Sequence, residues 1–310
     1  MKYDAKITAV LLLAFVASQL TGLAFVNGSI KAVETLPSGE KVIEHTETVI
    51  ERPQTQGVES LLFILSGVAI ATVLLLAIIK LRLFAAWKAW FFFAVFISIA
   101  VALGVYIDFL AAGILAFALA AAKILARNAI VHNLTEILMC SGIVVLFVPI
   151  FDILWIIALL LIISLYDVIA VRKTGHMVKM ARFLNETRLF AGFSIPLNEK
   201  GKQPVMARKA GERNNMPGRK GQRTAILGGG DIAFPMLFSG VVMEQLILSG
   251  FSNLQSFLLT MVVTMAVSLS LLGLLVIAKK GRFYPAMPFL TAGCLAGYAI
   301  LWLLASQILF

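Results

Sequence analysis

The sequence is poor in charged residues and in the side chains that usually hold metals or form disulfides. Only 14% of its 310 residues are charged and 60% are hydrophobic, whereas soluble domains usually carry about 25% charged residues. The two cysteines, Cys140 and Cys294, lie in apolar runs without redox or metal-ligand spacing, so we expect small buried hydrophobes. The three histidines are scattered, and we expect neither a metal site nor a cofactor. This composition is typical of a protein that crosses a membrane several times.

Nine apolar runs are long enough to cross a bilayer, whose core of about 30 Å requires about 20 residues of helix. We therefore expect an all-α polytopic membrane protein with nine transmembrane helices. The first run exceeds the usual length of a signal-peptide core and no clear cleavage site follows it, so we expect it to be retained. The runs cover residues 7–26, 60–79, 89–107, 109–126, 135–151, 153–171, 225–243, 254–278 and 285–308.

The basic residues lie almost entirely on one side of these spans. If the amino terminus is cytoplasmic and the spans alternate, 23 of the 26 lysines and arginines fall on the inside. Only Lys31, Lys41 and Arg52 fall outside, in a first loop that also carries six glutamates. The positive-inside rule then predicts a cytoplasmic N-terminus and an extracellular C-terminus in a multi-pass protein of the cell membrane.

The same charge pattern divides the chain into three parts. Residues 1–171 form an N-terminal membrane part with six helices, and residues 225–310 form a C-terminal part with three. Between them, residues 172–224 carry thirteen basic residues and three glutamates, a balance equal to the formal net charge of +10. We expect this loop to be mobile and to lie beside anionic lipid, with no nucleic-acid partner.

Two aspartates lie inside apolar runs that should be buried in the bilayer. Asp167 is five residues before the first basic residue of the long loop, and Asp231 is eight residues after the last. At about 1.5 Å of helical rise per residue, these positions are about 7–8 Å and at most about 12 Å inside the same membrane face. A carboxylate at membrane depth is costly and therefore indicates a functional site. The two spans run in opposite directions, so the two carboxylates could face each other.

Two close carboxylates in a site of low dielectric cannot both ionise cheaply, and they therefore share one proton. Such a pair can perform the chemistry of an aspartic protease. The ionised carboxylate takes a proton from water, while the protonated one polarises the scissile carbonyl group. Either Asp167 or Asp231 could hold the proton, and no metal or other nucleophile is required.

The neighbours of both aspartates fit this chemistry. Tyr166 places a phenol beside Asp167 as a possible hydrogen-bond donor, although tyrosines near a membrane interface are usually anchors. Gly228, Gly229 and Gly230 precede Asp231. They leave room for a substrate backbone and permit non-helical conformations, which at this depth are tolerated only against protein or a water-filled cavity.

A third segment, with Pro285, Ala286, Met287 and Pro288, opens the last span at about the same depth. Two prolines within four residues prevent a regular helix there and leave backbone carbonyl groups unpaired. A helix that simply starts with a proline would explain the same residues, so this segment gains weight only together with the two aspartates.

These three motifs together resemble the presenilin and signal peptide peptidase family of GxGD-type intramembrane aspartyl proteases. The YD motif (Tyr166-Asp167), the GxGD motif (Gly228 to Asp231) and a PAL-like motif (Pro285 to Met287) lie in the sixth, seventh and ninth spans. The resemblance covers essentially the whole chain. It implies that Asp167 and Asp231 are the catalytic pair and that Pro285, Ala286 and Met287 line the site and help to hold an unwound substrate, by strand addition.

The resemblance also implies a function and partners. We expect an intramembrane aspartic endopeptidase that cleaves single-span transmembrane proteins or peptides within the lipid bilayer, near their cytoplasmic end. The compact chain and its predicted orientation resemble presenilin homologues from microbes, such as archaea. Nothing in the sequence requires accessory subunits, and a homo-oligomer is compatible with it. Met287 replaces the leucine of the family motif, which affects the fit of the substrate more than the chemistry.

Two other functions use similar residues. An ion or solute transporter, or a leak channel, can use buried carboxylates beside broken helices, but the two halves of the chain show no inverted repeat. A prepilin-type peptidase shares the GxGD motif but usually has other flanking residues and another second aspartate.

Overall fold

The computed structural model of the protein describes residues 5–37, 39, 41–81, 83–125, 128–172, 191–196, 224–278 and 284–309. Within these ranges the chain forms nine long helices, one short 3-10 turn and two pairs of strands. The helices are α1 (Ala5–Ser29), α2 (Val58–Leu81), α3 (Phe84–Leu103), α4 (Phe109–Leu125), α5 (Ala129–Phe147), α6 (Ile153–Arg172), α8 (Gly229–Leu248), α9 (Asn253–Ile277) and α10 (Met287–Leu309). The strands are β1 (Ile30–Thr35), β2 (Lys41–His45), β3 (Gly192–Pro196) and β4 (Thr224–Gly228).

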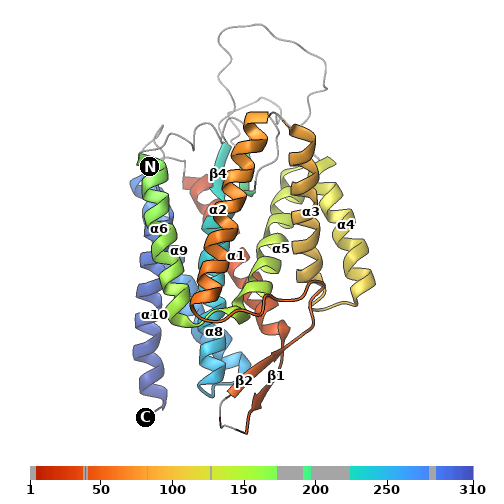
Figure 1. The fold of residues 1–310 in the computed structure, drawn as a ribbon. Helices are drawn as coiled ribbons and strands as arrows, with labels where there is room; N and C mark the ends of the chain where they lie inside the picture. The colour runs from red at the N-terminus through yellow and green to blue at the C-terminus, as the bar shows by residue number, and fades with distance from the viewer. Residues whose placement is uncertain are drawn as a thin grey trace, which may run out of the picture.

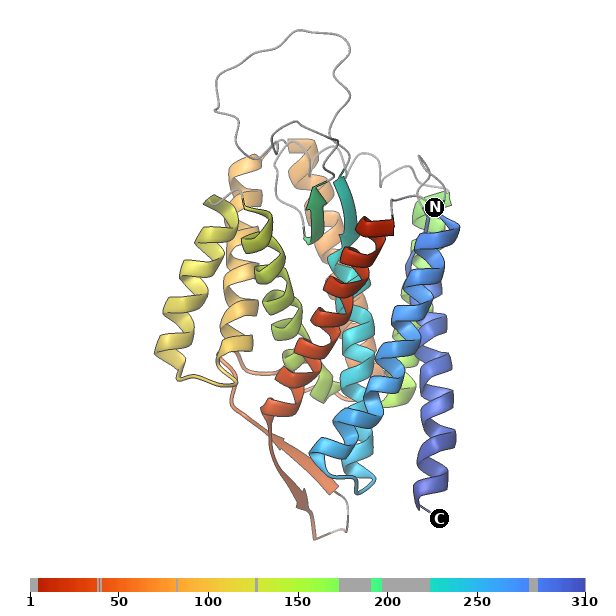
Figure 2. The ribbon, with the colours of Figure 1, turned by 180° about the vertical axis from the view of Figure 1, so that it is seen from behind.

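Each predicted span corresponds to one of these helices, which confirms the all-α polytopic fold. Eight helices are long and apolar enough to cross a membrane, while α4 is apolar but has only 17 residues. Consecutive helices run in opposite directions, so that α1 begins at one end of the bundle and α10 ends at the other (Figures 1 and 2). The assignment of the first end to the cytoplasm rests on the basic residues alone.

The seventh span begins later than the sequence predicted. Residues 225–228 were expected to be helical, but they belong to β4, which pairs antiparallel with β3. Gly228 is extended (φ −66°, ψ 147°) and precedes the first helical residue, Gly229. Glycine is a poor helix former, and β3 supplies the backbone hydrogen bonds that a helix would otherwise make. β3 itself lies within 172–224, which was expected to be a loop; the rest of that loop lies outside the described residues.

The fifth helix begins earlier than predicted, at Ala129 rather than at residue 135. The Asn128 side chain accepts a hydrogen bond from Ile130 N at 2.9 Å and caps the helix start. His132 and Asn133, which lie between the predicted fourth and fifth spans, are therefore in the first two turns of α5.

The centre of the bundle is formed by α1, α5 and α8, and α8 is the most buried of the spans. Phe15 of α1 and Phe238 of α8 are fully buried there. Small residues allow close helix packing elsewhere: a Cβ atom on Gly297 of α10 would lie 2.8 Å from the Val263 Cα atom of α9. Close backbone approach of this kind is the usual way in which membrane helices associate.

A polar cluster lies at the opposite end of the bundle from β4. The antiparallel β1–β2 hairpin ends there at His45, whose Nε2 atom lies 3.5 Å from Glu244 Oε1 of α8. The Arg52 guanidinium interacts electrostatically with both side chains. Burial, together with Arg52, lowers the pKa of His45 to about 4, so that the imidazole is neutral at neutral pH.

This burial predicts a loss of stability at acidic pH. Between about pH 6.5, the usual pKa of histidine, and about pH 4, the folded-state pKa, only the unfolded chain protonates His45. Stability therefore falls as the pH falls through this window, by up to about 2 kcal/mol at pH 5. We expect His45→Gln to lose less thermal stability than the wild type between pH 7 and pH 5 in detergent. The exposed Glu44→Gln is the control, and an unchanged loss in His45→Gln would contradict the prediction.

Candidate active site

Three helix ends that are distant in sequence meet at the end of the bundle where α1 begins. These are the C-terminal end of α6, the N-terminal end of α8 after β4, and the N-terminal end of α10 (Figures 1 and 2). A buried hydrogen bond of 2.7 Å joins Ser164 of α6 to Thr291 of α10. It lies about one helical turn from Asp167 and from Met287, and so fixes α10 against α6 beside the candidate site.

Asp167 faces the N-terminus of α10. Its Oδ2 atom accepts a hydrogen bond of 3.1 Å from Met287 N, and the Ala286 N–H also interacts with the carboxylate. α10 begins at Met287 because Pro285 and Pro288 favour the start of a helix and cannot continue one from the preceding segment. The first N–H groups of a helix have no partner within it and attract anions. The predicted PAL-like motif thus supplies backbone donors to a predicted catalytic residue.

Asp231 occupies the first turn of α8. It is the third helical residue after Gly228, and its carboxylate reaches back to the Gly228 backbone N–H. This is one half of a capping box, in which an acidic side chain binds the backbone at the start of its own helix. A Cβ atom on Gly228 would lie 3.3 Å from Asp231 Oδ2, so that glycine leaves space for the carboxylate at this position.

The two carboxylates are close enough for their charges to interact. Both side chains are partly buried, on two helices that pack against each other. Each carboxylate is also placed at a helix N-terminus, Asp167 at that of α10 and Asp231 at that of α8. The positive end of a helix dipole favours a negative charge, which offsets part of the cost of a carboxylate at membrane depth.

The other predicted site residues are placed unequally. Ala286 is partly buried beside Asp167, and Met287 is 4% exposed within the core. Gly230 is exposed, and a Cβ atom added there would contact the Phe234 ring of the same helix at 3.6 Å and no other described residue within 4 Å. Tyr166 is 54% exposed on the outside of α6. Neighbouring residues on a helix face different directions, and no hydrogen bond joins the Tyr166 phenol to Asp167 among the described contacts. The suggested hydrogen bond therefore stays a prediction.

Two residues near the site, Gln19 and Pro235, were missed by the sequence interpretation. Gln19 of α1 donates a buried hydrogen bond of 2.9 Å to the Ile232 carbonyl, one residue after Asp231. Pro235 lies inside α8 and cannot donate the helical hydrogen bond to the Asp231 carbonyl. The proline was a visible signal for an irregular first turn, but the partner on α1 could not be predicted from sequence spacing.

A helical membrane bundle with two interacting aspartates at helix N-termini near one end has the architecture of an intramembrane aspartyl protease. The sequence matches the family described as "Signal-peptide peptidase, presenilin aspartyl protease" over residues 40–308. The chain belongs to this family and is a multi-pass aspartic endopeptidase.

Solved structures show the same fold at low sequence identity. A presenilin family intramembrane aspartate protease in a C222 crystal form is 17% identical, covers 94% of this chain and 99% of its own, and has a TM-score of 0.59. A P2 crystal form of such a protease is 18% identical, with a coverage of 95% and 96% and a TM-score of 0.56. A comparison with curated protein sequences gave no significant match.

Proposed function

We propose that Asp167 and Asp231 are the catalytic pair of this protease and hydrolyse a peptide bond within a transmembrane segment. The observation that carries the proposal is the placement of the two carboxylates. They interact electrostatically at the meeting point of α6, α8 and α10, each beside backbone N–H donors. Such donors hold a carboxylate in one orientation, which is required for positioning a water molecule.

The reaction proceeds through one activated water. The ionised aspartate takes a proton from water, whose oxygen adds to the scissile carbonyl carbon, while the protonated aspartate donates its proton to the carbonyl oxygen. This forms a tetrahedral diol. The C–N bond then breaks as the first aspartate passes its proton to the amine nitrogen and the second recovers a proton from a diol hydroxyl group. The pair ends with one proton, as it began.

The substrate must be locally extended, because the carbonyl groups of an intact helix are hydrogen bonded and inaccessible. Gly228, Gly229 and Gly230 have no side chains beside Asp231, and Pro285 and Ala286 form non-helical backbone before α10. We propose that these residues hold an unwound segment of a single-span substrate. The basic-residue pattern predicts that they lie near the cytoplasmic face, and we therefore expect cleavage near the cytoplasmic end of the substrate helix.

The purified protein alone, in detergent micelles, should cleave a single-span helical substrate, because the proposed site lies within this one chain. A hydroxyl-bearing transition-state analogue should inhibit it, since the hydroxyl group mimics the tetrahedral diol. Mass spectrometry of the fragments gives the cleavage position. Ion flux through proteoliposomes without any cleavage would instead support the transporter or leak-channel function.

A further inference from the structure

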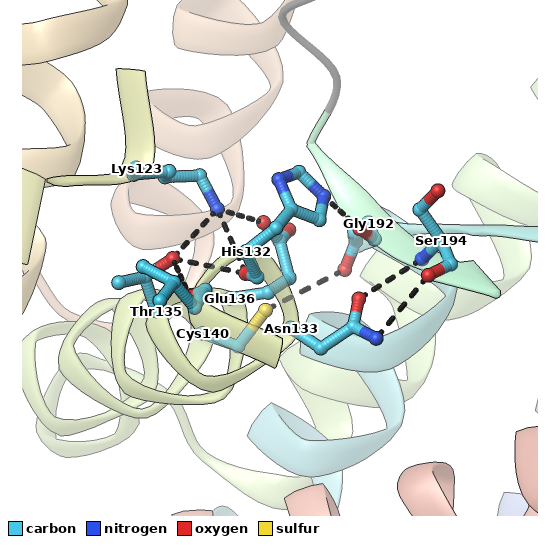
Figure 3. A network of polar contacts seen from close by, with 10 residues as sticks. Lys123, His132, Asn133, Thr135, Glu136, Cys140, Gly192 and Ser194 are labelled. Atoms are coloured by element: carbon cyan, nitrogen blue, oxygen red, sulfur yellow. Dashed lines mark hydrogen bonds and ion pairs between the residues drawn. The ribbon is translucent and has the colours of Figure 1, made fainter. Parts of the chain in front are cut away.

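A buried ion pair joins α4 and α5. These two helices lie on the opposite side of β3 from α10 (Figure 2). Lys123 Nζ lies 2.8 Å from Glu136 Oε2, and the two side chains are 1% and 0% exposed. Hydrogen bonds extend from this pair along α5 to β3 (Figure 3). We call the following residues the α5 polar network: Lys123, His132, Asn133, Thr135 and Glu136.

The lysine of the network is fully bonded, whereas the glutamate is not. Lys123 Nζ also contacts Thr135 Oγ1 at 3.2 Å and the His132 carbonyl at 3.3 Å. Glu136 Oε1 has no regular hydrogen-bond partner among the described residues. This oxygen lies beside Gly229, two residues before Asp231. A Cβ atom added to Gly229 would be only 2.9 Å from Glu136 Oε1. The Gly192 N–H also interacts with this carboxylate.

Two other members of the network bind the backbone of β3. Asn133 accepts a hydrogen bond from Ser194 N at 3.0 Å and donates one to Ser194 O at 3.2 Å. His132 Nε2 lies 2.9 Å from the Gly192 carbonyl oxygen, to which the neutral imidazole can donate. On its other side β3 pairs with β4 (Figure 3 shows the α5 side). The strand is therefore held between α5 and β4.

This contact continues to the candidate catalytic residue. β4 leads directly to Asp231 through Gly228, Gly229 and Gly230, which we call the glycine turn. Gly229 N donates a hydrogen bond of 3.1 Å to the Ala191 carbonyl, just before β3. The Cys140 thiol of α5 lies 4.0 Å from the Gly229 carbonyl oxygen. The backbone N–H of Gly229 therefore contacts the residue before β3, and the carbonyl oxygen of Gly229 contacts α5.

We infer that the α5 polar network positions Asp231 through β3 and the glycine turn. The inference rests on the proposed function, and its members are positioning residues that do not touch the substrate. Replacing a buried ion pair with apolar residues of similar volume often leaves stability unchanged or increases it. Stability therefore does not explain why a lysine and a glutamate are buried here. A role in fixing the positions of β3 and the glycine turn does explain it.

The first test removes the two hydrogen bonds between the Asn133 side chain and β3 without leaving a buried charge. We expect Asn133→Ala to lower kcat about tenfold, because small displacements of a catalytic group are costly, while KM changes less than about twofold. Hydrogen exchange should become faster in residues 192–196 and 224–231. Ser141→Ala is the control, since within the described part of the chain this buried hydroxyl on the same helix bonds only to Ile137 O. A wild-type kcat or unchanged exchange in Asn133→Ala, or an equal loss in Ser141→Ala, overturns the inference.

The second test concerns the ion pair. Lys123→Met alone should destabilise the protein, because it leaves Glu136 buried without its partner. The double variant Lys123→Met with Glu136→Met should recover the melting temperature but keep a kcat about tenfold below that of the wild type. Recovery of the full kcat would assign the pair a purely structural role and overturn the inference.

These measurements separate the inference from the proposed function. If the wild type does not cleave, or if Asp231→Ala still cleaves, the proposed catalytic pair is wrong. Hydrogen exchange over the two strands still decides whether the network holds them, since that measurement does not depend on proteolysis. Faster exchange with an unchanged kcat would instead leave the protease assignment intact and overturn the positioning role.

Discussion

Replacement of Asp231 by alanine, or of Asp167 by alanine, is expected to abolish cleavage of a helical membrane substrate. Each carboxylate has a role that the other cannot take over, since one removes a proton from water and the other donates one to the carbonyl oxygen. A loss of at least about 10⁴-fold in kcat is therefore expected for each variant, near the upper range for general acid–base catalysis. The double variant should be no worse than either single one, because the two groups act as a unit.

The same replacements should leave the fold intact. Removing a partly buried carboxylate relieves a desolvation cost, so the melting temperature in detergent should be equal to or above that of the wild type. Asp152→Asn is the matched control, because this exposed aspartate lies just before α6, at the other end of that helix from Asp167. Full proteolysis by the variant with both Asp167→Ala and Asp231→Ala would refute the proposed catalytic pair, whereas unfolding of both single variants would indicate a structural role.

The sequence predicted the helices and the common end of the bundle at which the motifs lie. A long apolar run in a membrane protein has few alternatives to a helix, because the bilayer offers no partner for backbone N–H and C=O groups. The alternation of spans predicts that the C-terminal end of α6 and the N-terminal ends of α8 and α10 lie at the same end of the bundle, as they do in the structure (Figures 1 and 2). The positions of the motifs along their spans were therefore sufficient to predict their depth in the bundle.

The surroundings of Asp231 could not be predicted in the same way. β4 is a strand because β3 lies beside it, and the two are separated by a long basic segment. The formation of such a short strand depends on its partner more than on local propensity. Lys123 and Glu136 lie at the ends of the predicted fourth and fifth spans, and the sequence pattern did not pair them. Only their contact at 2.8 Å makes both compatible with helices.

Replacement of Met287 by proline is expected to have the second-largest effect. This change removes the backbone N–H that donates to Asp167 Oδ2 at 3.1 Å. Met287 is the first residue of α10, a position at which proline fits the helix backbone, so α10 should still form, although loss of the buried Met287 side chain lowers the melting temperature. A hydrogen bond to a charged group is worth about 1.5–3 kcal/mol, and kcat should therefore fall about 10- to 100-fold.

The side chain and the backbone of Met287 can be separated with one further variant. Met287→Leu keeps the N–H group and nearly the same volume, and such exchanges are usually tolerated in a core. It should therefore cleave with a kcat close to that of the wild type, with any change appearing mainly as a shift in the cleavage position. If Met287→Pro also retains the wild-type kcat while remaining folded, the N-terminus of α10 does not orient Asp167. Among the described residues, the Ala286 N–H would then be the donor that holds the carboxylate.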